Sequence, residues 1–363
     1  MKKVLYLMHI DWNWIKQRPH FIAEKLKDKG YDIRVLYPLS RKRKNLTKNE
    51  DRNVKLCPYL RIPLRGKFKF LSYIDEKLVK FFIKFQIIMY KPDYIWVTFP
   101  ELNKFLPQNT SAKIIYDCMD DAVEFFSKTE QREIMQNNEK ELIKRANLLL
   151  ASSEYLKNKL LKKYNVRNEI YVIRNAHKFT NLTDKTEIQS ERSINTNFKI
   201  CYFGTISSWF DNEAITCMLN NFNNVEIHLI GPIEDGYEKL THNRLKYYGP
   251  VDHRDLAYYV SDADCFIMPF ILNELIKSVD PVKLYEYIYF NKSIISVYYD
   301  EIRYFNNFVE FYDSKDDLKK VLEKIILSNF EPKYSNVERL KFLKDNTWDS
   351  RVNEINKLIS TKI

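Results

Sequence analysis

Glycine and cysteine are scarce in this chain, and long apolar runs are missing. Of 363 residues, six are glycine and five are cysteine. The cysteines are odd in number and lack metal-ligand spacing, which is typical of reduced thiols in the cytoplasm. No apolar run approaches the ~20 residues that a membrane span requires. The basic start precedes only a short apolar run with no cleavage site, so we interpret residues 4–10 as a strand rather than a signal peptide.

The length and the alternation of elements predict two domains. Strand-like segments alternate with amphipathic helical segments in the first half, and a second such series begins at residue 198. This alternation favours α/β domains, each with a doubly wound parallel sheet. The polar stretch between the two series lacks apolar periodicity and indicates a linker. We therefore predict a first domain over 1–180, a linker over 181–197, a second domain over 198–340 and a terminal helical segment over 341–363.

Half of the glycines follow one pattern. Gly204, Gly231 and Gly249 each end a predicted strand of the second domain, and they are three of only six glycines. Ligands of open α/β sheets bind at the carboxyl ends of strands, where glycine permits close backbone approach. Tight-turn geometry alone is the alternative interpretation.

The segment 269–297 has the pattern of a ligand site. Asp280 before Pro281 indicates a helix start, and Lys283 and Glu286 lie three residues apart on one helix face. A helix N-terminus with a lysine in its first turn favours an anion, and a glutamate one turn later can accept hydrogen bonds from sugar hydroxyls. A solvated ion pair between the two side chains is the alternative.

Two further loops follow predicted first strands. After the strand that precedes Gly204, the backbone N–H groups of Gly204 and Thr205 can reach a diphosphate, unless Ser208 or Asp211 merely caps the next helix. In the first domain, the string 11–20 (DWNWIKQRPH) occupies the corresponding place. An arginine there can bind phosphate or an acidic acceptor, and its tryptophans can stack on a sugar or simply pack.

Three carboxylates, Asp117, Asp120 and Asp121, end another strand of the first domain. Such a group is costly unless it is solvated, paired or used. Binding of an acceptor hydroxyl by Asp117 or Asp120 is our preferred use, and capping of a helix by Asp120 or Asp121 is the alternative. The Asp-x-Asp at 262–264 directly precedes a strand and is best explained as coincidence.

These motifs together resemble the GT-B glycosyltransferases, and the string 11–20 is similar to the start of bacterial surface-glycan enzymes of the teichuronic-acid type. The resemblance implies two Rossmann-like domains facing a cleft, with the C-terminal helix returning to the first domain. It implies transfer of a sugar, with retention, from a nucleotide-sugar donor, expected to be UDP-linked, to a lipid-linked glycan of a bacterial capsule, O-antigen or cell wall. No metal or other cofactor is expected.

The site residues implied by the resemblance fall in three groups. The catalytic candidates are Arg18, Asp117 and Lys283. The donor-binding candidates are Gly204, Thr205, Ser207, Gly231, Ser278, Val279, Pro281, Lys283 and Glu286. The acceptor-binding candidates are Asp11, Trp12, Trp14, His20 and Asp120.

Two positions depart from the pattern of this family. Ser278 stands where the family has an acidic residue, and Asn291 replaces a glycine after the donor helix. The first departure keeps open a catalytically inactive scaffold or polyanion-binding module. An epimerase on the same fold is a weaker alternative, since it needs acid–base groups beside the sugar.

The net charge of +11 predicts an anionic partner. No nucleic-acid motif is present, which favours a membrane surface. The stretch 61–91 interleaves lysine and arginine with phenylalanine, and such a helix can lie on the anionic inner leaflet of the cytoplasmic membrane. The alternative is that most of its aromatic residues face the core.

Overall fold

The computed structural model describes residues 1–40, 54–179, 197–252 and 255–363. They form two compact units, one of Met1–Asn175 with Trp348–Ile363 and one of Ala176–Thr347. Nearly all of the predicted linker lies outside the described residues. The predicted terminal segment divides between two helices, because α10 (Asn336–Asp345) belongs to the second unit and α11 (Trp348–Lys362) to the first.

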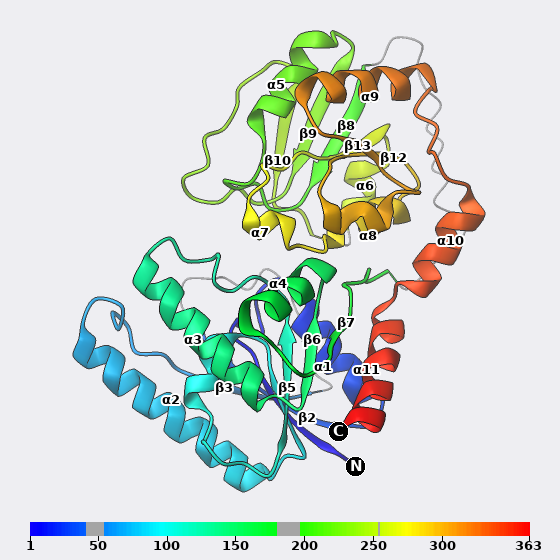
Figure 1. The fold of residues 1–363 in the computed structure, drawn as a ribbon. Helices are drawn as coiled ribbons and strands as arrows, with labels where there is room; N and C mark the ends of the chain where they lie inside the picture. The colour runs from blue at the N-terminus through cyan, green and yellow to red at the C-terminus, as the bar shows by residue number, and fades with distance from the viewer. Residues whose placement is uncertain (41–53, 180–196, 253–254) are drawn as a thin grey trace. The chain divides into compact units, whose positions relative to one another are not determined.

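The first unit is built on a seven-stranded parallel sheet (Figure 1). Its order is β3-β2-β1-β4-β5-β6-β7, so the chain winds in one direction from β1 and then in the other from β4. The four residues of β4 and of β6 are all buried, as expected for strands covered on both faces. The strands are β1 (Lys3–Leu7), β2 (Asp32–Pro38), β3 (Lys55–Tyr59), β4 (Tyr94–Val97), β5 (Lys113–Cys118), β6 (Leu148–Ala151) and β7 (Ile170–Val172).

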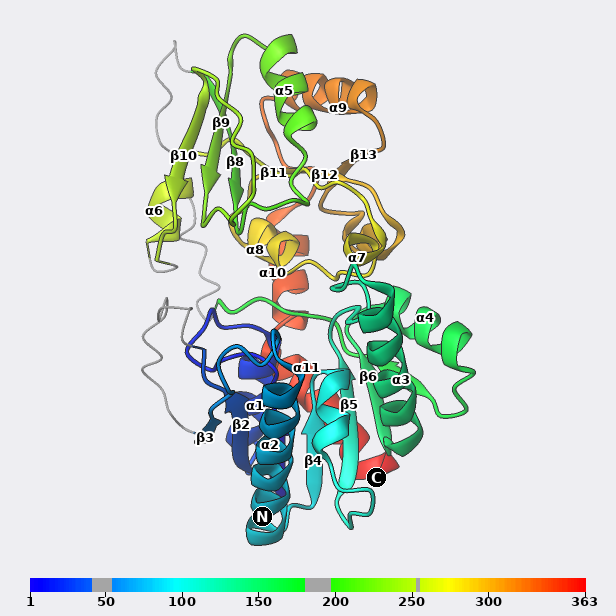
Figure 2. The same ribbon diagram turned by 90° about the vertical axis from the view of Figure 1, so that its left-hand side faces the viewer.

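Helices of the first unit cover both faces of this sheet (Figure 2). The terminal helix α11 packs on α1, where Phe21 stacks on Trp348 with ring centroids 5.1 Å apart and Tyr31 donates a 2.7 Å hydrogen bond to Asn356. On the other face, α2 and α3 contact η1. The helices are α1 (Arg18–Asp28), α2 (Lys69–Tyr90), η1 (Pro100–Phe105), α3 (Thr129–Arg145) and α4 (Glu154–Tyr164).

The second unit repeats this plan with a six-stranded parallel sheet of order β10-β9-β8-β11-β12-β13. A single apolar core runs through it, with α5 and α9 in contact and α8 contacting α10. The strands are β8 (Phe198–Phe203), β9 (Val225–Ile230), β10 (Leu245–Gly249), β11 (Cys265–Met268), β12 (Ser293–Val297) and β13 (Glu310–Tyr312). The helices are α5 (Asn212–Asn221), α6 (Leu256–Val260), α7 (Glu274–Lys277), α8 (Val282–Tyr289), η3 (Asp300–Phe305) and α9 (Lys315–Leu327), followed by α10.

The two parallel α/β sheets confirm the predicted fold class. Two strands escaped the sequence analysis, β3 and β13, and each lies at an edge of its sheet. β3 is only partly buried and β13 has three residues, so neither carries the buried apolar run by which the other strands are recognised. Among the described helices, none combines the length and the apolar composition that a bilayer crossing requires.

Candidate functional site

The second sheet has its switch point between β8 and β11. These two strands are neighbours, and the chain turns from β8 toward β9 but from β11 toward β12. The loops that leave their carboxyl ends therefore diverge, which is where ligands of doubly wound sheets bind. Gly204 follows β8 directly, and the loop after β11 leads to α8.

The three strand-end glycines lie on adjacent strands and pack backbone against backbone. Gly204 N–H donates to the carbonyl of Ile230 at 2.8 Å, and Gly231 N–H donates to the carbonyl of Gly249 at 2.8 Å. A Cβ atom on Gly231 would lie 2.0 Å from the carbonyl oxygen of Gly204. Gly231 is therefore required for the close approach of these two loops.

Lys283 lies across the backbone of Gly204. A Cβ atom on Gly204 would lie 2.1 Å from Lys283 Cε and 2.7 Å from its Nζ. The ammonium is 5.7 Å from the ring centre of Tyr202 and 5.8 Å from that of Phe270. Burial lowers the pKa of Lys283, with Glu286 opposing this effect. Among the described residues, no hydrogen bond or ion pair engages its Nζ, so the site has a cation without an anion.

The start of α8 differs in detail from the prediction. Pro281 is the residue before the helix, with φ −81° and ψ 114°, and α8 begins at Val282. Asp280 is buried and accepts hydrogen bonds from Tyr285 at 3.2 Å to each carboxylate oxygen. The predicted helix start is thus one residue early.

Glu286 lies one turn into α8 and is 8% exposed. Its carboxylate forms an ion pair with Lys178 at 3.7 Å. A solvated Lys283–Glu286 ion pair, the alternative considered from the sequence, is not among the ion pairs of the described residues. Glu286 therefore acts on Lys283 through its charge, without an ion-pair contact between the two side chains.

The remaining donor-binding candidates are held by local hydrogen bonds. The Thr205 carbonyl accepts from Tyr202 at 2.7 Å, and Ser207 donates to Glu234 at 2.6 Å. Ser278 is buried and donates to the Leu275 carbonyl at 2.7 Å at the end of α7. The Val279 carbonyl accepts from Tyr299 at 3.1 Å. Their predicted contacts with a donor stay predictions.

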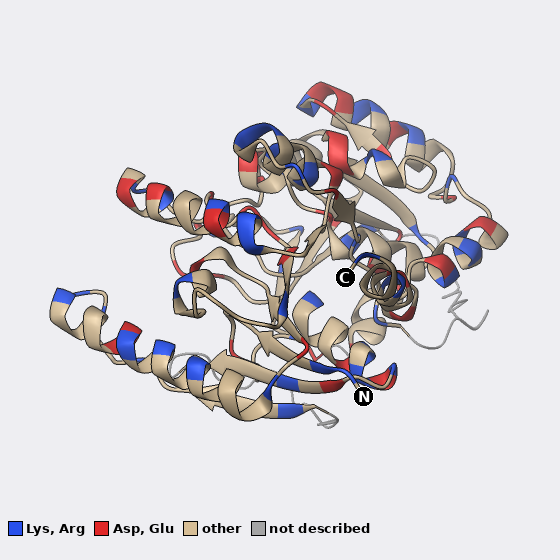
Figure 3. Cartoon of the chain, turned by 60° about the horizontal axis from the view of Figure 1, so that its bottom comes forward, with Lys and Arg blue, Asp and Glu red and all other residues tan. Residues whose placement is uncertain are grey.

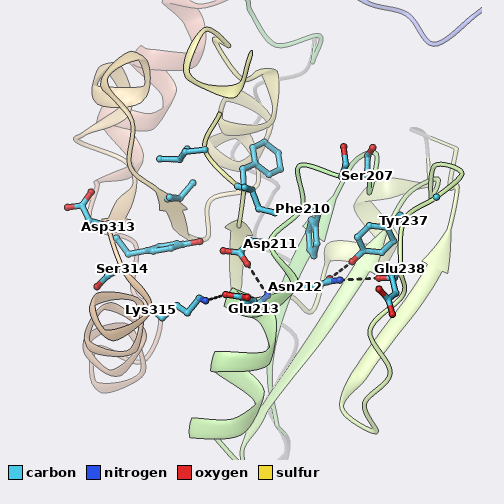
Figure 4. A pocket seen from close by; sticks show the side chains of 17 residues that line it. Ser207, Phe210, Asp211, Asn212, Glu213, Tyr237, Glu238, Asp313, Ser314 and Lys315 are labelled. Atoms are coloured by element: carbon cyan, nitrogen blue, oxygen red, sulfur yellow. Dashed lines mark hydrogen bonds and ion pairs between the residues drawn. The ribbon is translucent and has the colours of Figure 1, made fainter. Parts of the chain in front are cut away.

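A pocket of about 610 Å³ opens beside this site in the second unit (Figure 4). Asp211 caps α5 by accepting from the N–H of Glu213 at 2.9 Å and of Ala214 at 3.1 Å, so the capping alternative for Asp211 is correct. Lys315 pairs with Glu213 across the pocket. The carboxylates that line it disfavour a diphosphate, which leaves the Lys283 site as the better anion site.

In the first unit, Arg18 and Asp117 form a buried ion pair. Arg18 Nη2 lies 2.8 Å from Asp117 Oδ1, and the two side chains are 3% and 0% exposed. Arg18 Nη1 also donates to the Ile173 carbonyl at 2.7 Å. This pair ties α1 to β5 and to the chain after β7. A catalytic role for either residue stays a prediction, and the geometry gives both a structural role.

The loop after β1 is organised by its own side chains. Asp11 accepts from the N–H of Asn13 at 2.9 Å and of Ser40 at 2.7 Å. His20 is fully buried against Trp12, with ring centroids 4.7 Å apart, and it accepts from the Gln17 N–H at 3.1 Å as part of a capping box.

Burial lowers the pKa of His20 to about 4, so its ring is neutral. Trp14 is only partly buried, and of the predicted acceptor-binding residues in this loop it keeps the most accessible side chain.

The three carboxylates after β5 differ in their partners. Asp117 pairs with Arg18, and Asp121 pairs with Lys159. Asp120 has neither a side-chain hydrogen bond nor an ion pair among the described residues. Burial and the neighbouring carboxylates raise its pKa to about 7, although Arg18 opposes the shift.

No group of three or more metal-ligating side chains exists in the part of the chain that the structure describes. The Asp-x-Asp at 262–264 lies before β11, at the end of the sheet away from the site, where Asp264 accepts from the N–H of Lys199 at 2.8 Å.

Neither a protein-family model nor a curated protein sequence matches the chain. Solved structures match it along its whole length. The sucrose-phosphate synthase of Thermosynechococcus elongatus superposes with a TM-score of 0.75 at 12% identity, over 99% of this chain and 98% of the other. The lipopolysaccharide outer core galactosyltransferase WaaB gives 0.68 at 12% identity, over 99% and 100%.

The chain has the GT-B fold. HepE of Anabaena, solved with UDP and glucose, also matches with a TM-score of 0.68 at 14% identity, over 99% of this chain and 100% of HepE. The predicted resemblance is confirmed at the level of the fold. At these identities the matches leave the reaction itself to be argued from the site.

The sequence analysis missed three residues of this site. Tyr202 lies under the Lys283 ammonium, Glu234 accepts from Ser207, and Lys178 pairs with Glu286. Glu234 follows Gly231 by three residues and so belongs to a strand-end loop, which is a usable signal. Tyr202 and Lys178 have no such signal, because their roles depend on which segments meet in space.

Proposed function

We propose that this protein is a glycosyltransferase that moves a sugar, with retention, from a UDP-sugar to a lipid-linked glycan of a bacterial capsule, O-antigen or cell wall. The proposed place of action is the inner face of the cytoplasmic membrane. The observation that carries the proposal is the Lys283 ammonium, which lies over Gly204 at the switch point without an anionic partner among the described residues. Proteins of the same fold have been solved with UDP and with UDP-glucose, in the case of HepE.

The donor diphosphate would occupy the space between the Gly204 loop and the start of α8. The backbone N–H groups at the helix N-terminus and the Lys283 ammonium favour negative charge there. Filling this position with a diphosphate gives the half-buried ammonium its counter-ion and offsets its desolvation. Glu286, one turn further on, would accept hydrogen bonds from the ribose hydroxyls.

The proposed reaction needs no enzyme nucleophile. The bond between the anomeric carbon and the leaving phosphate oxygen breaks, and the acceptor hydroxyl oxygen forms the new bond on the same face of the sugar. The proton of that hydroxyl passes to the leaving phosphate, so the products are the glycoside and UDP. Lys283 would stabilise the charge that develops on the phosphate, and no step requires a metal.

The first unit would bind the acceptor. Asp120 and Trp14 are the best candidates there, since Asp120 has no side-chain partner among the described residues and Trp14 is not fully buried. A carboxyl group with a raised pKa can exchange a hydrogen bond with an acceptor hydroxyl in either protonation state.

The test is release of UDP from a panel of UDP-sugars in the presence of a lipid-linked acceptor fraction. We expect release with at least one sugar, and its loss in Lys283→Met. Lys277→Met is the matched control, because Lys277 is a nearby exposed lysine paired with Glu274. UDP binding without any transfer would instead favour the inactive scaffold that the serine at position 278 keeps open.

A further inference from the structure

Helix α2 presents a large apolar surface to solvent. It buries only four of its 22 residues, Asp75, Val79, Ile83 and Tyr90. Phe70 is 71% exposed, Phe81 70% and Phe85 48%. The alternative that most aromatic residues of this stretch face the core does not hold, since only Tyr90 is buried in it and Phe82 packs partly against it, while the others are exposed. Contiguous exposed apolar side chains of this number mark an interaction surface.

The side chains of α2 are sorted into three stripes along the helix. The buried stripe consists of Asp75, Val79, Ile83 and Tyr90, spaced by four, four and seven residues. The apolar stripe consists of Phe70, Ile74, Leu78, Phe81, Phe85 and Ile88, spaced by three or four. The lysine stripe consists of Lys77, Lys80 and Lys84, with the same spacing.

Helical geometry places the lysine stripe between the buried stripe and the apolar stripe. Figure 3 shows blue, the colour of lysine and arginine, recurring along α2, with red only toward its beginning. No ion pair engages Lys77, Lys80 or Lys84 among the described residues. A core-facing stripe explains why the helix folds against the unit, but it explains neither of the other two stripes.

The loop before α2 extends this surface. The buried Asp75 carboxylate accepts from Arg61 Nε at 2.7 Å and from the N–H of Ile62 at 2.6 Å, which fixes the loop to the helix. Leu64 in this loop has φ +60° and is 59% exposed. A leucine in the left-handed region is strained. Because this side chain is exposed, burial within the unit does not offset the strain.

We propose that α2 and the loop before it dock the protein on an anionic lipid surface. The apolar stripe would enter the boundary between head groups and acyl chains, and the lysine stripe would contact lipid phosphates. Charge complementarity favours lipid over a second copy of this chain, because pairing two such helices would bring their lysines together. The proposal agrees with a lipid-linked acceptor but does not rest on the donor chemistry.

The experiment is sedimentation of the purified full chain with vesicles. One set contains about a third anionic phosphatidylglycerol and the other only zwitterionic phosphatidylcholine. We expect binding to the anionic vesicles that weakens with salt. Replacing Lys77, Lys80 and Lys84 together by glutamine should weaken binding on the order of a hundredfold, at roughly fivefold per lysine. Replacing Phe81 and Phe85 by serine should weaken it by about tenfold or more.

Matched controls separate a surface effect from a change in total charge. Replacing Lys319, Lys320 and Lys324 of α9 by glutamine removes the same charge from the second unit, and replacing Leu327 removes an apolar side chain that is 87% exposed. Both should bind vesicles like the unaltered chain. Glu286→Ala should also bind normally, so a failure of the donor site leaves this test intact.

Two results would overturn the proposal. One is equal binding by the α2 and α9 variants, which would reduce the effect to net charge. The other is that the unaltered chain binds no vesicles and is a dimer, whereas the variant with Phe81 and Phe85 replaced is a monomer. That result would assign the surface to a second copy of the chain. Because the altered side chains are exposed, all variants should unfold at the temperature of the unaltered chain.

Discussion

Replacing each strand-end glycine by alanine should have different consequences, because a new Cβ atom meets different neighbours. At Gly231 the Cβ would lie 2.0 Å from the backbone oxygen of Gly204, which cannot move without moving its strand. At Gly204 it would meet two side-chain ends, that of Lys283 at 2.1 Å and the hydroxyl of Tyr202 at 3.3 Å, and no backbone atom is among its nearest neighbours. At Gly236, also with positive φ, nothing lies within 4 Å.

The magnitudes follow from two contributions. Forcing alanine into a positive-φ conformation costs about 1–2 kcal/mol at each position. Overpacking against a fixed backbone adds about 1–3 kcal/mol at Gly231 only. We therefore expect a loss of unfolding free energy of about 2–5 kcal/mol for Gly231→Ala and about 1–2 kcal/mol for both Gly204→Ala and Gly236→Ala.

Gly204→Ala should differ from Gly236→Ala in ligand binding. Displacement of the Lys283 side chain should abolish stabilisation by UDP, whereas Gly236→Ala should keep it. Urea unfolding measures the stability and thermal unfolding with UDP measures the binding. If Gly231→Ala costs no more than Gly236→Ala, or if Gly204→Ala keeps full UDP stabilisation, the reasoning from these contacts is refuted.

Three other predictions concern the first unit. Asp120 has a pKa of about 7 in the folded state against an ordinary value of 3.8 for a free aspartate, so the stability held by its neutral form is present below pH 4 and is lost as the pH rises through 7. The free energy of unfolding of Asp120→Asn, relative to that of the unaltered chain, should therefore rise by about 2 kcal/mol from pH 4 to pH 8, after allowance for partial exposure. Chemical unfolding at both pH values measures this difference. Arg18→Met should lose about 3–5 kcal/mol because it leaves the Asp117 carboxylate buried without its partner, and the double change with Asp117→Leu should recover much of this loss in the same assay. Asp75→Ala should make the chain near Arg61 more sensitive to limited proteolysis, with little change in sensitivity elsewhere. Equal cleavage of Asp75→Ala and the unaltered chain would contradict the anchoring role of Asp75.

The sequence predicted those features that local patterns determine. Buried strands such as β4 and β12 are short apolar runs between turn signals, and the helix with Lys283 and Glu286 has a proline at its start. The close backbone approach at the strand-end glycines was also predictable. A positive φ and a close approach are conformations that glycine adopts without strain.

The partners of individual side chains were not predictable. Nothing in the sequence shows that Arg18 and Asp117, 99 residues apart, form one buried pair, or that Glu286 pairs with Lys178 rather than with Lys283. The direction of the aromatic residues of α2 was likewise open, since the helix has two apolar stripes and the sequence does not say which one is buried. These questions depend on tertiary packing, which local periodicity does not contain.

The central claim is that the Lys283 site binds the diphosphate of a UDP-sugar. The most direct measurement is thermal unfolding of the unaltered chain, Lys283→Met, Glu286→Ala and the control Lys277→Met, each with UDP, GDP, CMP and TDP. At a hundredfold its dissociation constant a ligand adds about 2.7 kcal/mol, or roughly 5–10 °C for a unit of this size.

We predict that UDP raises the unfolding temperature of the unaltered chain and of Lys277→Met, and that it leaves the other two variants unchanged. Absence of any rise with millimolar nucleotide, or a rise that persists in Lys283→Met, would contradict the account.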